Sequence, residues 1–140
     1  MSETVGDCAE EDAVFDAFDP FKAVDFLESR ACDLRHAMAR PDRPDAIAAL
    51  RDRQAASHEG WLSLIGVLDR VAGAYVAEQV AGLYGFHGRV AACLERGLDP
   101  RLGPQVAVRV RVQLLAELQA RTGATVAAVL EQTSAAGHPS

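Results

Sequence analysis

Aromatic residues and cysteine are scarce in this 140-residue chain, and both shortages limit the fold classes and cellular locations that it can have. Aromatic residues make up 6% of the chain and include a single tryptophan, while Ala, Leu, Val and Arg dominate, a composition that favours helices over sheets. The cysteines, Cys8, Cys32 and Cys93, are odd in number, widely spaced and form no Cys-x-x-Cys pair. Because disulfide frameworks need paired cysteines, we expect free thiols and a cytoplasmic location.

Long hydrophobic runs are also missing. The most apolar run, from Trp61 to Leu68, is followed at once by Asp69 and Arg70, so it is too short to cross a membrane. The first seven residues are acidic and lack the apolar core of a secretory signal. We therefore expect no transmembrane segment.

Positive charge is almost absent from the start of the chain. Residues 1–28 carry nine acids and only Lys22, a balance of −8, whereas residues 29–140 carry thirteen arginines against eleven acids, a balance of +2. The acidic head argues against nucleic acid as a partner, because such partners require clustered positive charge. We interpret the later arginines chiefly as the solvated faces of helices.

Motifs of catalysis and cofactor binding are not found either. The sequence holds no Ser-His-Asp, Walker or dinucleotide pattern. Glu28, Cys32 and His36 are spaced four residues apart, a geometry that could ligate a metal, but the di-metal bundles that use Glu-x-x-His pairs need two such motifs and two further glutamates. We expect no enzymatic activity, no metal and no cofactor.

Helical periodicity is what the chain has in quantity. Asp19-Pro20 is a typical helix start, and from Phe21 to Met38 apolar residues recur every three or four positions. This pattern predicts a helix to about Ala39, which the prolines that follow bring to an end.

A second, much longer helix is predicted from about Asp45 to Gly97, a residue well suited to a C-cap. Unbroken, it would span about 75 Å at 1.5 Å per residue. A third helix is expected from Gly103-Pro104 to about Thr133. Alternating valines in residues 105–112 are also compatible with an edge strand, but we favour a helix because no second strand signal offers a partner.

Glycines crowd the long predicted helix, above all in the stretch Gly-Leu-Tyr-Gly-Phe-His-Gly at residues 82–88. Each helical glycine costs up to about 1 kcal/mol relative to alanine, so the cost needs a reason. We predict either close packing against another helix or a hinge at 82–88 that folds the helix into two halves. The residues assigned to these roles are Gly66, Gly73, Gly82, Gly85 and Gly88. A ligand pocket around Tyr84, Phe86 and His87 is the less favoured alternative.

These observations predict an all-α protein of three helices, one of them long and amphipathic, with coiled-coil-like or bundle packing. Residues 1–18 are expected to be an acidic flexible tail, residues 19–133 a single helical domain and residues 134–140 a frayed tail. The long helix has more apolar surface than two shorter helices readily cover. We therefore expect a homo-oligomer.

The segment from Asp45 to Trp61 resembles the start of the long helix in phasins, the proteins that coat polyhydroxyalkanoate storage granules. Leu50, Gln54, Ala56 and Gly60 follow the rhythm of that family, and the layout of residues 18–133 is similar in outline. The resemblance implies a structural coat protein without catalytic residues.

The long amphipathic helix also supplies the predicted binding surface, because its apolar face can lie on a hydrophobic surface or in a partner's groove. We expect granule coating as the first hypothesis, and a helical adaptor or chaperone for a protein partner as the second. A bundle that binds a small molecule or metal is the third. The residues predicted to make the contact are Trp61, Ile65, Leu68, Tyr75, Leu83 and Phe86.

Overall fold

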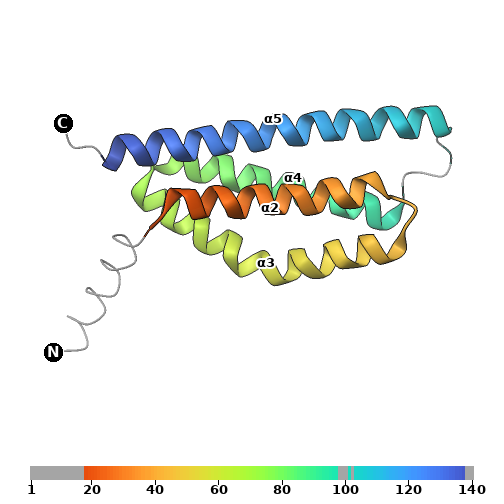
Figure 1. Cartoon of the computed structure of the whole chain (residues 1–140), viewed down its shortest axis with the longest axis horizontal. Coiled ribbons are helices and arrows are strands. Elements are labelled where there is room, and N and C mark those ends of the chain that lie inside the picture. The colour runs from red at the N-terminus through yellow and green to blue at the C-terminus, as the bar shows by residue number, and fades with distance from the viewer. Residues whose placement is uncertain (1–17, 98–100, 102, 138–140) are drawn as a thin grey trace.

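The computed structural model describes residues 18–97, 101 and 103–137. These residues form four helices, α2 (Pro20–Ala39), α3 (Pro44–Val71), α4 (Ala74–Arg96) and α5 (Pro104–Gly137). Figure 1 shows them side by side, each running opposite to the one before it, so the fold is an up-down-up-down bundle. The all-α class is confirmed, whereas the expectation of three helices is wrong.

The long predicted helix is divided at Ala72 and Gly73. Gly73 has a φ of 100° and a ψ of 165°, a conformation that side chains other than glycine's rarely allow. The amides of Ala72 and Gly73 both donate to the carbonyl of Leu68, at 2.8 and 3.0 Å, which closes the last turn of α3. The chain then reverses, and α4 packs along α3 as its main partner. A hinge therefore exists, but at Gly73 instead of at 82–88.

Residues 82–88 themselves are regular helix within α4. A Cβ added at Gly82 or Gly88 would meet nothing within 4 Å, and one at Gly85 only a side-chain nitrogen of Arg89 at 3.6 Å. Gly66 in α3 is equally open. Within the described residues, the predicted close packing at these four glycines is therefore wrong, because no atom of a neighbouring helix lies within contact distance of the position that a side chain would take.

The remaining helix boundaries agree well with the sequence signals. The Oδ1 atom of Asp19 accepts a hydrogen bond of 2.9 Å from the amide of Phe21, and Pro20 occupies the first turn of α2. Gly97, with a φ of 74°, follows the last residue of α4. Residues 105–112 are helical, and α5 continues beyond Thr133 as far as Gly137. The predicted acidic tail lies almost entirely in residues 1–17, outside the described residues, whereas residues 134–137 of the predicted frayed tail belong to α5.

Two apolar cores fill the bundle, one toward each end. One core contains Leu34, Met38 and Phe86, and the other contains Leu27, Trp61 and Leu83. Among the described residues no helix is both long enough and apolar enough to cross a membrane.

Candidate functional site

Polar side chains interrupt the apolar interior between the two cores. Each helix contributes at least one of these polar residues. Along its own helix, each of them lies next to a residue of one apolar core or between residues of both. These residues are Arg30 and Asp33 from α2, Gln54 and Ser57 from α3, His87 from α4, and Thr122 and Thr125 from α5. A polar layer of this kind favours one helix register, because slipping the helices would bury its groups without partners.

Arg30, Asp33, Arg53 and His87 meet around a small cavity within this layer. Asp33 bridges the two arginines, with its Oδ2 atom 3.1 Å from Nη2 of Arg30 and its Oδ1 atom 2.9 Å from Nη1 of Arg53. The Nε2 atom of His87 and the Nε atom of Arg30 are buried without a hydrogen bond from the described residues. The cavity offers about 10 Å³ to the centre of a water molecule, which is room for about one water and not for an organic ligand.

Burial lowers the pKa of His87 from its usual 6.5 to about 4, and the charge of Arg30 adds to the effect while Asp33 opposes it. The imidazole is therefore neutral at pH 7. A general base works best when its pKa lies near the working pH, and this side chain is only 1% exposed. Both properties favour a structural role for His87 over a role in proton transfer.

Trp61 lies at the centre of an aromatic cluster beside this cavity. Its ring stacks on Tyr84, with centroids 5.0 Å apart, and meets Phe26 and His87 edge-on at 5.2 and 5.4 Å. The hydroxyl of Tyr84 is hydrogen-bonded to Nδ1 of His58. The stretch that includes Tyr84 and His87 thus serves α3–α4 packing, and its aromatic residues form no open ligand pocket.

The predicted contact surface is largely interior. Four of its six residues are at most 3% exposed (Trp61, Leu68, Leu83 and Phe86), Ile65 is half-buried, and only Tyr75 is well exposed, at 65%. The prediction that those four residues form a surface is wrong, because the reversal at Gly73 folds the two halves of the long helix against each other. Each half then covers the apolar face of the other.

The most apolar open site among the described residues is a shallow groove between α2 and α3. The residues that line it are Phe18, Asp19, Lys22, Ala23, Phe26, Gly60, Ser63, Leu64 and Val67. It offers about 420 Å³ to water centres, within the range of ligand and side-chain pockets. Polar atoms contribute little of its surface, and the polar side chains among its lining residues are those of Asp19, Lys22 and Ser63.

Gly60 shapes this groove. A Cβ added to Gly60 would lie 3.1 Å from Cε2 of Phe26, so the absence of a side chain lets the ring rest against the backbone of α3. Sequence reasoning missed the groove because Phe26 falls outside the apolar stripe of the first helix. The one available signal was a glycine inside a helix next to the only tryptophan.

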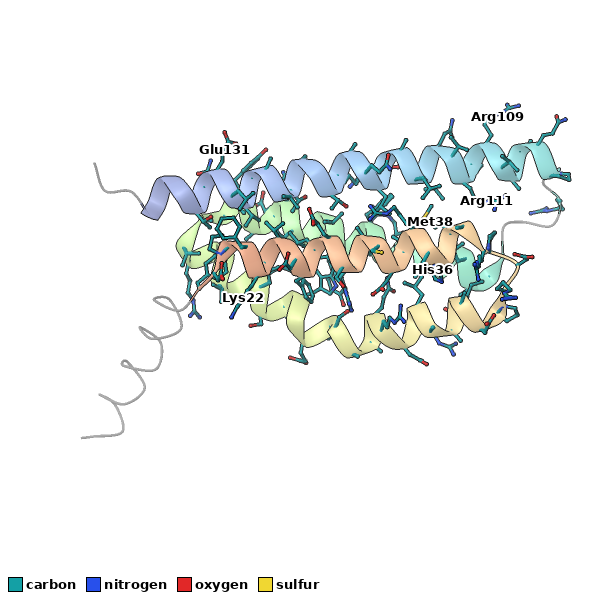
Figure 2. All side chains as sticks on the ribbon, in the orientation of Figure 1. Lys22, His36, Met38, Arg109, Arg111 and Glu131 are labelled. Carbon is teal, nitrogen blue, oxygen red and sulfur yellow. The ribbon has the colours of Figure 1, made fainter. Side chains whose placement is uncertain are left out.

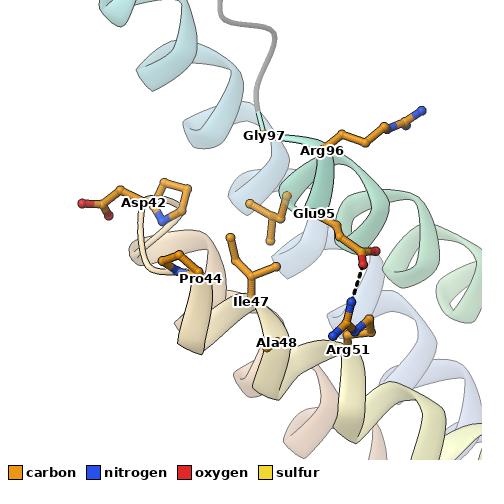
Figure 3. A pocket seen from close by; sticks show the side chains of 10 residues that line it. Asp42, Pro44, Ile47, Ala48, Arg51, Glu95, Arg96 and Gly97 are labelled. Atoms are coloured by element: carbon orange, nitrogen blue, oxygen red, sulfur yellow. Dashed lines mark hydrogen bonds and ion pairs between the residues drawn. The ribbon is translucent and has the colours of Figure 1, made fainter.

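A second cleft lies at the other end of the bundle, where the start of α3 meets the end of α4 (Figure 3). It offers about 470 Å³, and its charged lining includes Asp42, Arg51, Glu95 and Arg96. The Nη1 atom of Arg51 and the Oε1 atom of Glu95 form an ion pair of 2.7 Å across it. Because these neighbouring charges largely balance, the cleft favours no particular charged ligand.

The polar flank of α2 does not gather into a metal site. Cys32 and His36 are exposed, and no cluster of three or more His, Cys, Asp or Glu side chains suited to a metal ion occurs in the part of the chain that the structure describes.

The chain matches no protein-family model, no curated protein and no solved structure. The phasin resemblance therefore rests on the sequence rhythm alone.

Proposed function

We propose that this protein is a non-enzymatic helical binding module that takes an amphipathic helix of a protein partner into the groove between α2 and α3. The observation that carries the proposal is the groove itself, an apolar trough between two helices that stays open while the rest of the apolar interior is covered.

The shape and chemistry of the groove fit a helix better than a small polar ligand. Phe26, Leu64 and Val67 provide apolar contacts, and helix-in-groove recognition uses such contacts for affinity. Lys22 and Asp19 also line the groove and could fix the orientation of a partner through its charges. Figure 2 shows Lys22 on the side of α2 that faces away from α5.

A photo-crosslinking amino acid placed at Ser63 tests the proposal in the cells that produce the protein. Ser63 is exposed and lines the groove, whereas Ala55 is an exposed residue of the same helix that does not line it. We expect one partner segment, with apolar residues at helical spacing, to be captured from position 63 and not from position 55. Capture of nothing at position 63, or of the same proteins at both positions, would contradict the proposal.

A coat on polyhydroxyalkanoate granules is a second proposal, favoured by the phasin-like rhythm and by exposed apolar side chains on three helices, Phe21 at 68%, Leu62 at 47% and Tyr75 at 65%. Co-sedimentation with polyhydroxybutyrate particles distinguishes it from the first. Binding that Phe21→Glu and Tyr75→Glu weaken, while Ser63→Trp leaves it intact, would favour the granule surface over a protein segment.

A further inference from the structure

The outer face of α5 packs against no other described helix, and small uncharged residues run along its middle, with exposed Glu117 at one edge. Residues 113, 116, 120, 123 and 127 are all exposed, recur at alternating spacings of four and three, and are Gln, Ala, Ala, Gly and Ala. The opposite face of the same helix carries the buried residues Leu118, Thr122, Thr125 and Val129. Accordingly α5 separates apolar from polar residues less sharply than the other three helices do.

One charge of each sign closes this outer face at its ends. Arg109 continues the same spacing, and Glu131 lies one residue beyond the next position of that spacing; both are exposed and lie equally far from Ala120 along the helix. Figure 2 shows both side chains on the side of α5 that points away from the bundle, whereas Arg111 points toward it. Val108 and Val112, which are 49% and 60% exposed, flank the end that carries Arg109.

We propose that this face binds the same face of a second copy of the chain, with the two α5 helices antiparallel and related by a two-fold axis at Ala120. Spacing that alternates between four and three residues is the repeat of a coiled-coil seam, and small residues in it allow the two backbones to approach closely.

The charges select the antiparallel arrangement. With the axis at Ala120, Arg109 of each copy lies opposite Glu131 of the other, so the dimer gains two equivalent opposite-charge pairs. A parallel pairing would instead set arginine against arginine and glutamate against glutamate, which opposes association. The antiparallel arrangement also covers Val112 with the alanine-rich end of the second α5, and a two-fold interface closes on itself instead of growing into a fibre.

The proposed dimer leaves the groove between α2 and α3 free. Of the packed helix pairs, α3 and α5 make the weakest contact, and Figure 1 shows them on opposite sides of the bundle. A dimer through α5 would thus present two grooves at its outer sides. The dimer does not depend on the proposed function, and it can form whether or not the groove binds a partner.

Cysteine crosslinking tests the arrangement directly. In the full chain with Cys8, Cys32 and Cys93 replaced by Ser, we expect Ala120→Cys to form an intermolecular disulfide in mild oxidant. Ala116→Cys is the matched control, because an antiparallel pair separates the two copies of residue 116 by about 12 Å along the axis at 1.5 Å per residue. Combining Ala116→Cys with Ala124→Cys should restore the crosslink, since these positions lie opposite each other.

Charge reversal supplies a second, independent measurement. We expect sedimentation equilibrium to give a dimer for the native chain. Arg109→Glu or Glu131→Arg alone should raise the dissociation constant of the dimer by about tenfold. The two changes together should return it to near the native value, because the opposite charges again face each other. The five substituted positions of α5, namely 109, 116, 120, 124 and 131, are all exposed, so the helical circular dichroism of each variant is enough to detect misfolding.

Three results would overturn the inference. The first is a native chain that stays monomeric at about 100 µM, a concentration at which even a weak homodimer would be detected. The second is equal crosslinking of Ala116→Cys and Ala120→Cys. The third is a double charge-reversed variant whose dimer is no tighter than that of either single variant.

Discussion

The free energy of unfolding of this protein should decrease steeply as the pH falls through a window set by one buried histidine. The pKa of His87 is lowered to about 4 in the folded chain, against 6.5 when unfolded. Between pH 6.5 and 4, His87 binds a proton in the unfolded chain but stays neutral in the folded chain. Its contribution to the free energy of unfolding is therefore fully present above pH 6.5. It is lost progressively as the pH falls toward 4.

The size of the loss follows from the two pKa values. A shift of one unit corresponds to about 1.4 kcal/mol, so the fall from 6.5 to about 4 corresponds to about 3 kcal/mol. That is a large share of the 5 to 15 kcal/mol typical of a small domain. The charges that face the ring are Arg30 and Asp33 from α2 and Arg53 from α3, all of which line the cavity around it.

Urea unfolding at a series of pH values measures this loss, with the fluorescence of Trp61 as the signal. Trp61 is the only tryptophan, and its ring lies 5.4 Å from that of His87. We expect His87→Gln to be less stable at pH 7 but to lose much less stability between pH 6.5 and 4. His36→Gln, at an exposed histidine of α2, controls for the removal of a histidine as such. Equal pH dependence in the native chain and in His87→Gln would show that His87 does not cause the loss of stability.

Other changes should alter stability by amounts that thermal or urea unfolding can resolve. Gly88→Ala should stabilise by about 0.5 to 1 kcal/mol, since its Cβ enters open space in a regular helix, whereas Gly73→Ala should destabilise because of its φ of 100°. A destabilised Gly88→Ala would show that a neighbour packs there. Asp19→Ala should cost about 1 kcal/mol through loss of the N-cap of α2, and an unchanged midpoint would count against that cap. Asp33→Asn should cost about 1 to 3 kcal/mol, because the partly buried charge of Arg30 then lacks its carboxylate partner. Asp45→Asn, at an exposed ion pair of 3.9 Å, should change little.

Local signals predicted the helix ends well. Asp19-Pro20 and Gly97 act in the structure as the sequence indicates, because a cap depends on residues within one turn of it. The helical spacing of residues 105–112 likewise prevailed over the alternating valines, since no other strand exists among the described residues to pair with them.

The reversal at Gly73 could not be located from the sequence. Several glycines along the predicted helix offered the same local freedom, and the 82–88 stretch, with three of them, offered the strongest signal. Which glycine turns is decided by packing, because a turn at Gly73 lets α4 lie along α3 with Leu83 and Phe86 facing inward. Because of the same reversal, Trp61 is buried in the core, whereas the sequence predicted it on the binding surface.

The groove depends on an even less local feature. Phe26 and Gly60 are far apart in sequence and come together only when α2 crosses α3, so no periodicity within either helix reveals the site. The pairing of Asp33 with Arg53 from α3 is hidden from the sequence for the same reason.

The proposed binding site for a partner is the open groove between α2 and α3, and not the face around Trp61. Calorimetric titration of the partner segment captured from position 63 tests it most directly, with Ser63→Trp to fill the groove and Ala55→Trp as the matched change outside it. We expect at least a tenfold loss of affinity for Ser63→Trp, because the indole would keep at least one apolar side chain of the partner out of the groove, and burial of such a side chain contributes about 1.4 kcal/mol or more. Ala55→Trp should keep native affinity. Native affinity for Ser63→Trp would show that the partner does not bind in the groove.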